Sequence, residues 1–409
     1  MKPLRLVPVL SAVGLLVAAC SSGGGGGAAT PSATVPSDLS ISVFTADMTY
    51  MSKLTNLTKA GKGSVGVVLP DTTSSVRYVQ FDAPLLDKAF KLAGYSSSQY
   101  NIQNAQGDQA KELSIAQADI SNGATVLIMD PLNSTVGSQI QQYAQSHGVK
   151  VISYDRATFT GTNTYYISFD NVQVGKLIGQ GFKDCVTAWN VSNPKIFTLN
   201  GGQNSDPNAI DFAKGYNSVV WGDSVPQEQA GKTSSQGWTL VGDQVATDWK
   251  NDVGQQIFQT AFTAHPEINA TIEANDGLGN AVITVLKSKG VSAKKIPTTG
   301  QDATLDGMVN VLQNYQCGSV YKAIYLEAQD AVALATVLRA GATPPQALVN
   351  GSTSPPQGVA GSTQPASLLV PVWVNTQNMK DTVIKDNFVD KTTLCGKAGA
   401  SACSAAGIS

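Results

Sequence analysis

The sequence predicts an α/β protein with two domains, each built on a parallel sheet. Short runs rich in β-branched residues alternate with helix-like stretches along most of the chain, which is the pattern of parallel sheets. About ten such runs are present, more than one compact sheet usually holds. The length of 409 residues also suits two domains that each bury a core.

The expected strands come in order along the chain, and glycines mark the ends of the helices between them. The helical patterns Pro84–Ala93 and Ala110–Ile120 stop at Gly94 and Gly123, as helices commonly do. The expected strands are Val65–Leu69, Thr125–Met129, Val149–Tyr154, Tyr165–Phe169, Lys195–Leu199, Thr239–Val241, Ala270–Glu273, Lys295–Thr299, Ser319–Tyr321 and Leu368–Val374.

The N-terminal segment has the pattern of an export signal. Lys2 and Arg5 precede an uncharged apolar stretch over 6–19, too short to span a membrane and suited to a signal peptide over 1–19. Small residues before Cys20 resemble the lipobox of bacterial lipoproteins, in which the cysteine is acylated. We therefore expect a lipid-anchored Cys20, a flexible linker over 20–61 and a protein held at the outer face of the cell membrane. The alternative is an ordinary signal peptide with a chance cysteine.

Composition excludes several classes of function. Lys and Arg number 27 against 29 Asp and Glu, so no basic surface for nucleic acid is expected. The chain has two histidines, His147 and His265, which argues against a multi-histidine metal site. Nucleotide-binding P-loop, zinc-protease and serine-hydrolase motifs are absent from the sequence,. We expect neither a metal nor a cofactor.

Four cysteines follow Cys20, and an exported protein can pair them in disulfides. They allow three pairings. Cys395 with Cys403 closes a short C-terminal loop, which leaves Cys185 with Cys317 as a second bridge. A zinc site is the competing interpretation, but no CxxC spacing occurs.

Polar side chains follow the expected strands of both domains at their carboxyl ends. Asp155 and Arg156 follow VISY, Asn275 follows TIEA, and Lys322 follows SVY. Ligands of open parallel sheets bind outside this edge, so the pattern predicts a cleft rich in hydrogen-bonding groups. Vicinal sugar hydroxyls match Asp, Asn and Arg side chains, while aromatic rings such as Tyr78 and Trp249 can cover the apolar face of a sugar. Each such Asp or Asn alone is more often a helix cap.

The same strand-end segments carry a family resemblance. The stretch VISYDRATFTGTNTYYISFDNVQVGKLIG, together with SDPNA, GDQVATDW, ANDG, GQDA and VYK in that order, resembles the periplasmic sugar-binding proteins of ABC transporters. Within the ribose, galactose and xylose group, the match is best to the D-xylose-binding branch. The resemblance spans about Val65 to Phe388 and implies two Rossmann-like lobes joined by a three-crossing hinge, the type I periplasmic binding protein fold.

The resemblance implies boundaries and a set of ligand-binding residues. Lobe one would comprise 62–168 and 323–366, lobe two 169–322 and 367–394, and a cysteine-bearing tail 395–409. Asn171 would lie at the first crossing, and Lys322 at a hinge position typical of the xylose type. The implied sugar-binding residues are Arg77, Tyr78, Asp155, Arg156, Asn171, Asn208, Trp249, Asn275, Asp302 and Lys322.

The function implied is capture of a monosaccharide, D-xylose first, by a monomeric, non-enzymatic receptor that delivers it to an ABC permease. Tyr78 stands where the xylose type has Trp, so another pentose or a hexose such as glucose is an alternative, as is a chemosensory role. A less favoured hypothesis is a carbohydrate-active enzyme with Asp155 and Asp302 as its carboxylate pair. The segment 344–367 is long, Pro-rich and irregular, and we expect it to form a surface excursion near the last crossing.

Overall fold

The computed structural model describes residues 34–203 and 205–408. The expected signal peptide and Cys20 lie outside these residues. No helix of the described part is long and apolar enough to cross a membrane. The helices are α1 Thr55–Ala60, α2 Ala83–Leu92, α3 Gln109–Ser121, α4 Ser134–Ser146, α5 Asn171–Ala188, α6 Pro207–Val220, α7 Asn251–Ala264, α8 Asp276–Ser288, α9 Leu305–Leu312, α10 Ile324–Arg339, α11 Lys391–Ala398 and α12 Ala400–Ala405.

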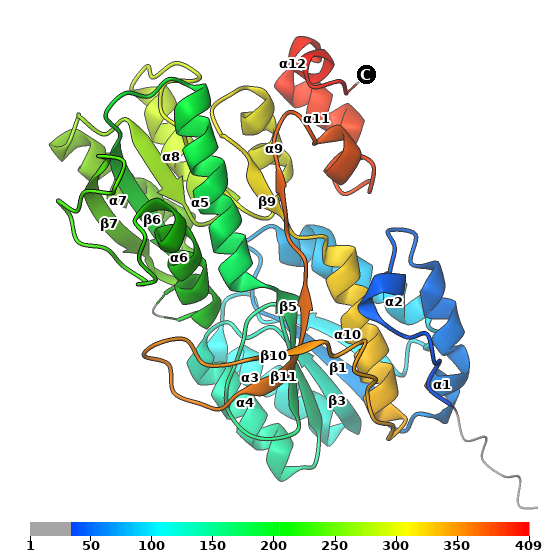
Figure 1. Ribbon diagram of the computed structural model, residues 1–409. Helices are drawn as coiled ribbons and strands as arrows, with labels where there is room; N and C mark the ends of the chain where they lie inside the picture. The colour runs from blue at the N-terminus through cyan, green and yellow to red at the C-terminus, as the bar shows by residue number, and fades with distance from the viewer. Residues whose placement is uncertain (1–33, 204, 409) are drawn as a thin grey trace, which may run out of the picture. The chain divides into compact units, whose positions relative to one another are not determined.

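Lobe one is a seven-stranded sheet in the order β10-β11-β5-β4-β3-β1-β2. All neighbouring strands are parallel except the edge pair β10 and β11. One face packs against α2 and α10, and the other against α3 and α4 (Figure 1). The strands are β1 Ser64–Leu69, β2 Tyr100–Asn104, β3 Ala124–Met129, β4 Lys150–Tyr154, β5 Thr164–Phe169, β10 Gly351–Thr353 and β11 Gln364–Leu369.

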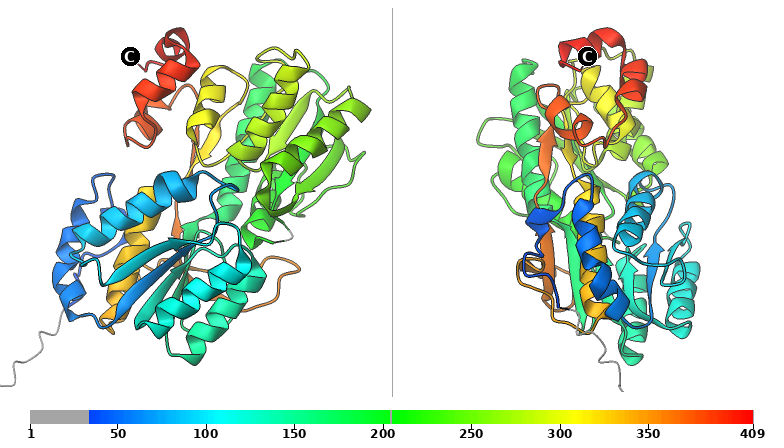
Figure 2. Two further views of the ribbon diagram at one scale, coloured as in Figure 1. Left: turned by 180° about the vertical axis from the view of Figure 1, so that it is seen from behind. Right: turned by 90° about the vertical axis from the view of Figure 1, so that its right-hand side faces the viewer.

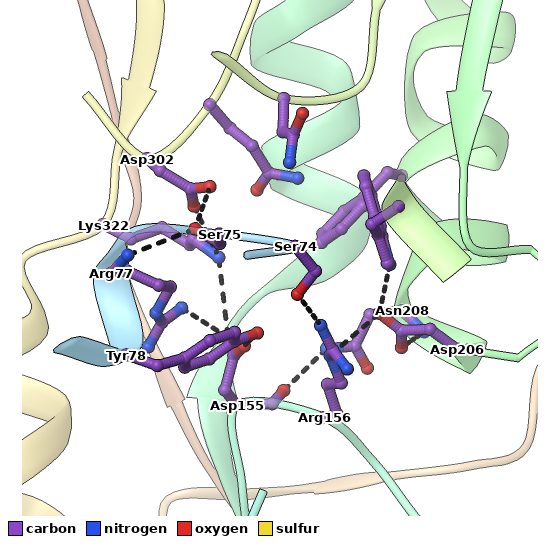
Figure 3. A pocket seen from close by; sticks show the side chains of 14 residues that line it. Ser74, Ser75, Arg77, Tyr78, Asp155, Arg156, Asp206, Asn208, Asp302 and Lys322 are labelled. Carbon is purple, nitrogen blue, oxygen red and sulfur yellow. Dashed lines mark hydrogen bonds and ion pairs between the residues drawn. The ribbon is translucent and has the colours of Figure 1, made fainter. Parts of the chain in front are cut away.

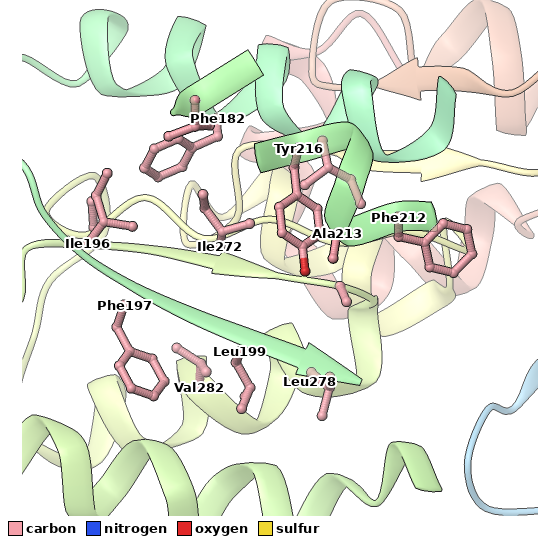
Figure 4. Packing of buried hydrophobic residues seen from close by; sticks show 14 of the residues in the cluster. Phe182, Ile196, Phe197, Leu199, Phe212, Ala213, Tyr216, Ile272, Leu278 and Val282 are labelled. Atoms are coloured by element: carbon pink, nitrogen blue, oxygen red, sulfur yellow. The ribbon is translucent and has the colours of Figure 1, made fainter. Parts of the chain in front are cut away.

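Lobe two contains the parallel strands β7 Thr239–Ala246, β6 Lys195–Gly201 and β8 Ala270–Glu273, in that order, and a separate antiparallel pair, β9 Ser319–Tyr321 with β12 Val372–Val374. Alternate side chains of β6 serve opposite faces of the sheet. Ile196 lies on the side of Phe182, whereas Phe197 and Leu199 lie on the side of Val282 (Figure 4). Both faces are thus buried, which explains the nearly continuous apolar run of β6.

The expected strand Lys295–Thr299 does not form. Pro297 has no N–H to donate, and only its carbonyl joins β8, through the Thr271 N–H. Beyond it, side chains replace the backbone ladder: the Glu273 N–H donates to the Thr299 hydroxyl at 2.8 Å, and the Thr299 N–H donates to the Glu273 carboxylate at 2.7 Å. The segment is therefore attached to β8 mainly through side chains and forms no strand of the sheet.

Three passages connect the lobes, as the predicted fold class requires. They lie between β5 and α5, between β9 and α10, and between β11 and β12; Figure 2 shows them from two further sides. The last one splits the expected strand Leu368–Val374 at Val370–Pro371. Residues 367–369 therefore pair with β5 of lobe one, three residues beyond the predicted boundary.

Residues 34–61 ahead of β1 are folded, which corrects this part of the expected linker over 20–61; the rest of that linker lies outside the described residues. Residues 49–60 form a 3₁₀ turn, Thr49–Leu54, followed by α1. Met48, Met51 and Leu54 are fully buried in the core of lobe one. The Gly/Ser and Pro content of 21–37 suggested a spacer. The apolar side chains of residues 48–54, which follow it, pack against α2 and α10 instead.

The tail is also part of the fold, and both favoured disulfides are present. Cys395 pairs with Cys403 across α11 and α12, and Cys185 pairs with Cys317 in lobe two. Leu394 and Cys403 pack in one cluster with Met308 and Val311 of α9. The tail therefore extends the core of lobe two.

Shortening a buried side chain of the N-terminal segment tests whether it belongs to the fold. Leu54→Ala is expected to lower the free energy of unfolding by about 2–5 kcal/mol, because it leaves a cavity in the core. The matched control Ser52→Ala changes an exposed neighbour. Urea unfolding measures both, and equal midpoints for the two variants would contradict the assignment.

Candidate functional site

A narrow polar cavity lies between the two lobes at the carboxyl ends of their strands, with an open volume of about 30 Å³. Figure 3 shows charged side chains of both lobes converging on it. Its lining residues are Ser74, Ser75, Arg77, Tyr78, Asp155, Arg156, Asp206, Asn208, Phe212, Trp249, Asn275, Gln301, Asp302 and Lys322.

Nine of the ten residues that the sequence singled out border this cavity. The exception is Asn171, the first residue of α5, whose amide donates to the Tyr166 hydroxyl at 2.9 Å. The nine are Arg77, Tyr78, Asp155, Arg156, Asn208, Trp249, Asn275, Asp302 and Lys322.

Arg77 is surrounded by carboxylates. Its Nε and Nη2 donate to Asp82 at 2.9 and 2.8 Å, its Nη2 also donates to Glu327 at 2.7 Å, and its Nη1 donates to Asp155 at 2.6 Å. The side chain is 1% exposed. Four of its five N–H groups are therefore engaged, which leaves one N–H for a ligand and makes Arg77 mainly a support for Asp155.

Lys322 joins carboxylates of the two lobes. Its Nζ lies 3.1 Å from Asp302 Oδ1 and 3.5 Å from Asp155 Oδ1. Burial would raise the pKa of Asp155, but the charges of Arg77 and Lys322 outweigh it and lower that pKa to about 2. Burial likewise would lower the pKa of Lys322, and the two carboxylates raise it. Both groups stay charged at neutral pH and present fixed acceptors and donors.

Two glycines at the end of β6 make room for the indole of Trp249. A Cβ on Gly201 would lie 2.1 Å from Trp249 Cε3, and one on Gly202 would lie 2.1 Å from Nε1. The indole Nε1 donates to Asp206 at 3.1 Å, and the ring meets Phe212 edge-on at 6.2 Å between centroids. Trp249 is thereby held as a wall of the cavity.

Tyr78 forms an aromatic wall in lobe one. The guanidinium carbons of Arg156 and Arg77 lie 5.5 and 5.6 Å from its ring centre, within cation–π range. Its hydroxyl lies 3.3 Å from Asp155 Oδ2 and donates to it. Arg156 itself donates to the Pro131 and Leu132 carbonyls and to Ser74.

Uncommon backbone conformations cluster at the cavity. Asp155, Asp302 and Trp249 have φ values of 57°, 90° and 60°. Asp adopts a positive φ more readily than most residues, whereas a positive φ is an outlier for a bulky residue such as Trp. Such conformations persist where the surrounding structure imposes them, commonly at ligand sites.

Sequence reasoning missed five lining residues. Asp206 lies inside the SDPNA segment and Gln301 directly precedes Asp302, so both were in motifs already noted. Ser74 and Ser75 belong to the loop after β1, and Phe212 projects from α6. No local pattern distinguishes these last three from ordinary loop and core residues.

The geometry argues against acid–base catalysis by Asp155 and Asp302. A glycosidase needs one carboxylic acid with a raised pKa opposite a carboxylate. Here Lys322 lies between the two carboxylates, and the pKa of Asp155 is lowered. Within residues 34–203 and 205–408, no cluster of three or more His, Cys, Asp or Glu could hold a metal ion.

Fold and cavity together define a two-lobed binding protein. The family model for the periplasmic binding protein domain matches residues 65–343. The D-xylose-binding periplasmic protein of Escherichia coli is 33% identical over 294 residues, 72% of this chain and 82% of that protein. The multiple sugar-binding periplasmic protein SbpA of Azospirillum brasilense is 29% identical, over 83% of this chain and 94% of its own.

The solved structures agree on the fold. An ABC transporter solute-binding protein from Clostridium phytofermentans with bound β-D-glucose superimposes with a TM-score of 0.67, covering 81% of this chain and 99% of its own at 23% identity. The chain belongs to the periplasmic binding protein family, in its type I sugar-binding group. The predicted family and fold class are confirmed, and the relatives are binding proteins, not enzymes.

Crowding Trp249 tests its place in the site. Gly201→Ala is expected to weaken monosaccharide binding by at least about tenfold, because the new Cβ displaces the indole. The control Gly396→Ala adds a Cβ that meets nothing within 4 Å. Calorimetric titration gives the affinities and circular dichroism checks the fold; unchanged binding by folded Gly201→Ala would remove Trp249 from the site.

Proposed function

We propose that this protein captures D-xylose and delivers it to an ABC importer. The observation that carries the proposal is the cavity, in which lobe-one and lobe-two side chains offer charged and amide groups around a small volume between two aromatic walls. Vicinal hydroxyls can donate to Asp155 and Asp302 and accept from Arg156 and Lys322.

Charge balance at the cavity favours a neutral ligand. Three cations, Arg77, Arg156 and Lys322, line it with three carboxylates, Asp155, Asp206 and Asp302. Lys322 is paired with two of these carboxylates, and Arg77 is compensated by Asp155, Asp82 and Glu327. A phosphate or carboxylate on the ligand would have to displace these partners, whereas hydroxyls add to them.

The choice of a pentose rests on the relatives. A hexopyranose adds a hydroxymethyl group that xylose lacks. Xylose-binding relatives from Escherichia coli and Haemophilus influenzae, 33% and 31% identical, support the same choice. The second candidate is glucose, and Tyr78 favours it. The D-xylose type carries Trp at this position, and because a phenol is smaller than an indole, Tyr78 leaves more room for the hydroxymethyl group of glucose.

Membrane attachment through Cys20 is the second part of the proposal. It is supported by the apolar stretch and small residues that precede this cysteine,. Acylation would hold the receptor near the permease it serves. Cys20→Ala should move the protein from the membrane fraction to the soluble exported fraction, as immunoblotting of fractions would show. Equal membrane retention of variant and wild type would exclude a lipid anchor at Cys20.

Calorimetric titration of the purified protein tests the ligand. D-xylose is expected to bind one-to-one at micromolar or lower Kd, about −8 kcal/mol or better, with D-glucose, L-arabinose and D-ribose at least about tenfold weaker. Asp302→Ala should lose about 1–3 kcal/mol of xylose binding, because Lys322 and the ligand lose an acceptor. The exposed Asp306→Ala is its control.

Two outcomes would redirect the proposal. Tighter binding of glucose than of xylose would replace the sugar and keep the receptor. Absence of heat with all four sugars would overturn the assignment of a monosaccharide from this set.

A further inference from the structure

We propose that Asp276, a buried carboxylate outside the cavity, is a positioning residue that holds the turn presenting Asp302 to the sugar. The proposal rests on the sugar-binding function above and deepens it, because it gives the acceptor Asp302 a support within lobe two. Asp276 is the first residue of α8 and is fully buried. It does not border the cavity, so its effect on the ligand must pass through Asp302.

Four hydrogen bonds from three residues converge on the Asp276 carboxylate. Its Oδ1 accepts from Gln316 Nε2 at 2.8 Å and from the Ser319 hydroxyl at 2.7 Å. Its Oδ2 accepts from the Thr304 N–H at 2.8 Å and from the Thr304 hydroxyl at 3.0 Å. The carboxylate therefore joins the start of α8 to the segments on both sides of α9.

The two hydroxyls are fixed as donors toward this carboxylate. The Ser319 hydroxyl accepts from the Ala303 N–H at 3.0 Å, and the Thr304 hydroxyl caps α9 by accepting from the Gly307 N–H at 3.1 Å. A hydroxyl has one hydrogen of its own, and in both residues it is left to donate to the carboxylate. Asp276 therefore anchors Thr304 directly and Ala303 through Ser319.

The turn that carries Asp302 needs an anchor because its backbone is unusual. Asp302 and Ala303 have φ values of 90° and 48°, a region that residues other than glycine seldom occupy and that persists where the surroundings impose it. On the other side of the turn, the Asp276 N–H donates to the Gln301 carbonyl at 3.0 Å. The anchored residues thus flank Asp302, whose carboxylate lies 3.1 Å from Lys322 Nζ.

Two glycines leave room for the Asp276 carboxylate. A Cβ on Gly300 would lie 2.1 Å from Asp276 Oδ1, and one on Gly307 would lie 2.2 Å from Oδ2. The residues before and after the turn are thus small enough to let the carboxylate reach it.

The network requires the ionised form of Asp276. Burial is the largest influence on its pKa and, with the charge of Asp302, raises it to about 7, although the hydrogen bonds to the carboxylate lower it. A protonated carboxyl has a hydrogen of its own where four donors already point. The turn should therefore loosen, and sugar affinity should fall, as the pH falls through about 7.

A double-mutant cycle separates positioning from a general structural role. Asp276→Asn keeps the shape of the side chain but replaces an acceptor by a donor, so it should weaken sugar binding by about tenfold. In the Asp302→Ala background, the same change should cost less than about twofold, because the residue that it positions is gone. Asp306→Asn, at a side chain that is 66% exposed, is the control and should have no effect in either background. Calorimetric titration measures all variants with every sugar that binds wild type.

A pH profile provides a second readout. The loss caused by Asp276→Asn should be larger at about pH 8 than at about pH 6, because Asp276 of the wild type is mostly protonated at the lower pH and Asn does not titrate. All other titratable groups are common to the two proteins. An equal loss at both pH values would contradict the requirement for the ionised form.

A milder variant covers the case in which Asp276→Asn folds poorly, as circular dichroism would show. Ser319→Ala removes only the link to Ala303. It should weaken sugar binding about threefold, and only when the Asp302 side chain is present.

A sugar-free readout separates this proposal from the choice of ligand. Hydrogen exchange of the Ala303 N–H should be faster in Asp276→Asn than in wild type, relative to the amides of β6. Failure of every sugar to bind wild type would overturn the proposed ligands, and Ala303 exchange would then decide on Asp276. Equal losses with and without the Asp302 side chain, or unchanged Ala303 exchange, would overturn the positioning role.

Discussion

The buried guanidinium of Arg77 is the interaction on which the site depends. A charge out of water must be matched by partners, and Arg77 obtains Asp82, Glu327 and Asp155 from three separate elements of lobe one. Because Asp155 is held there, it can share Lys322 with Asp302 of lobe two. The buried charge of Arg77 is thus linked, through Asp155 and the hinge residue Lys322, to Asp302 of the opposite lobe.

The consequence is a site whose polar groups are oriented before a ligand arrives. Trp249 is positioned by two glycines and Asp206, and Tyr78 lies near both Arg77 and Arg156. Groups that already have defined partners lose little freedom when a ligand binds, which favours affinity. Residues whose hydrogen-bonding groups are mostly taken by protein partners support the cavity, whereas residues with unused groups can contact a sugar. Only the hydrogen-bond distances show which residues are of which kind.

Much of this could be predicted from the sequence because parallel strands bring their carboxyl ends to one edge. That rule and the family resemblance together gave ten proposed site residues, nine of which border the cavity. The sequence could not show that Asn208 hydrogen-bonds to lobe one, because its partners are 42 to 53 positions away along the chain. Nor could it show that the residues before β1 are folded, since their burial depends on α2 and α10, which come later in the sequence.

The disulfide between Cys185 and Cys317 joins two elements that start or end at the hinge. Cys185 lies on α5, which begins at the first passage, and Cys317 lies two residues before β9, which ends at the second. The covalent link limits how far these two parts of lobe two can move apart. Lobe two is therefore expected to reorient as one body when the hinge moves.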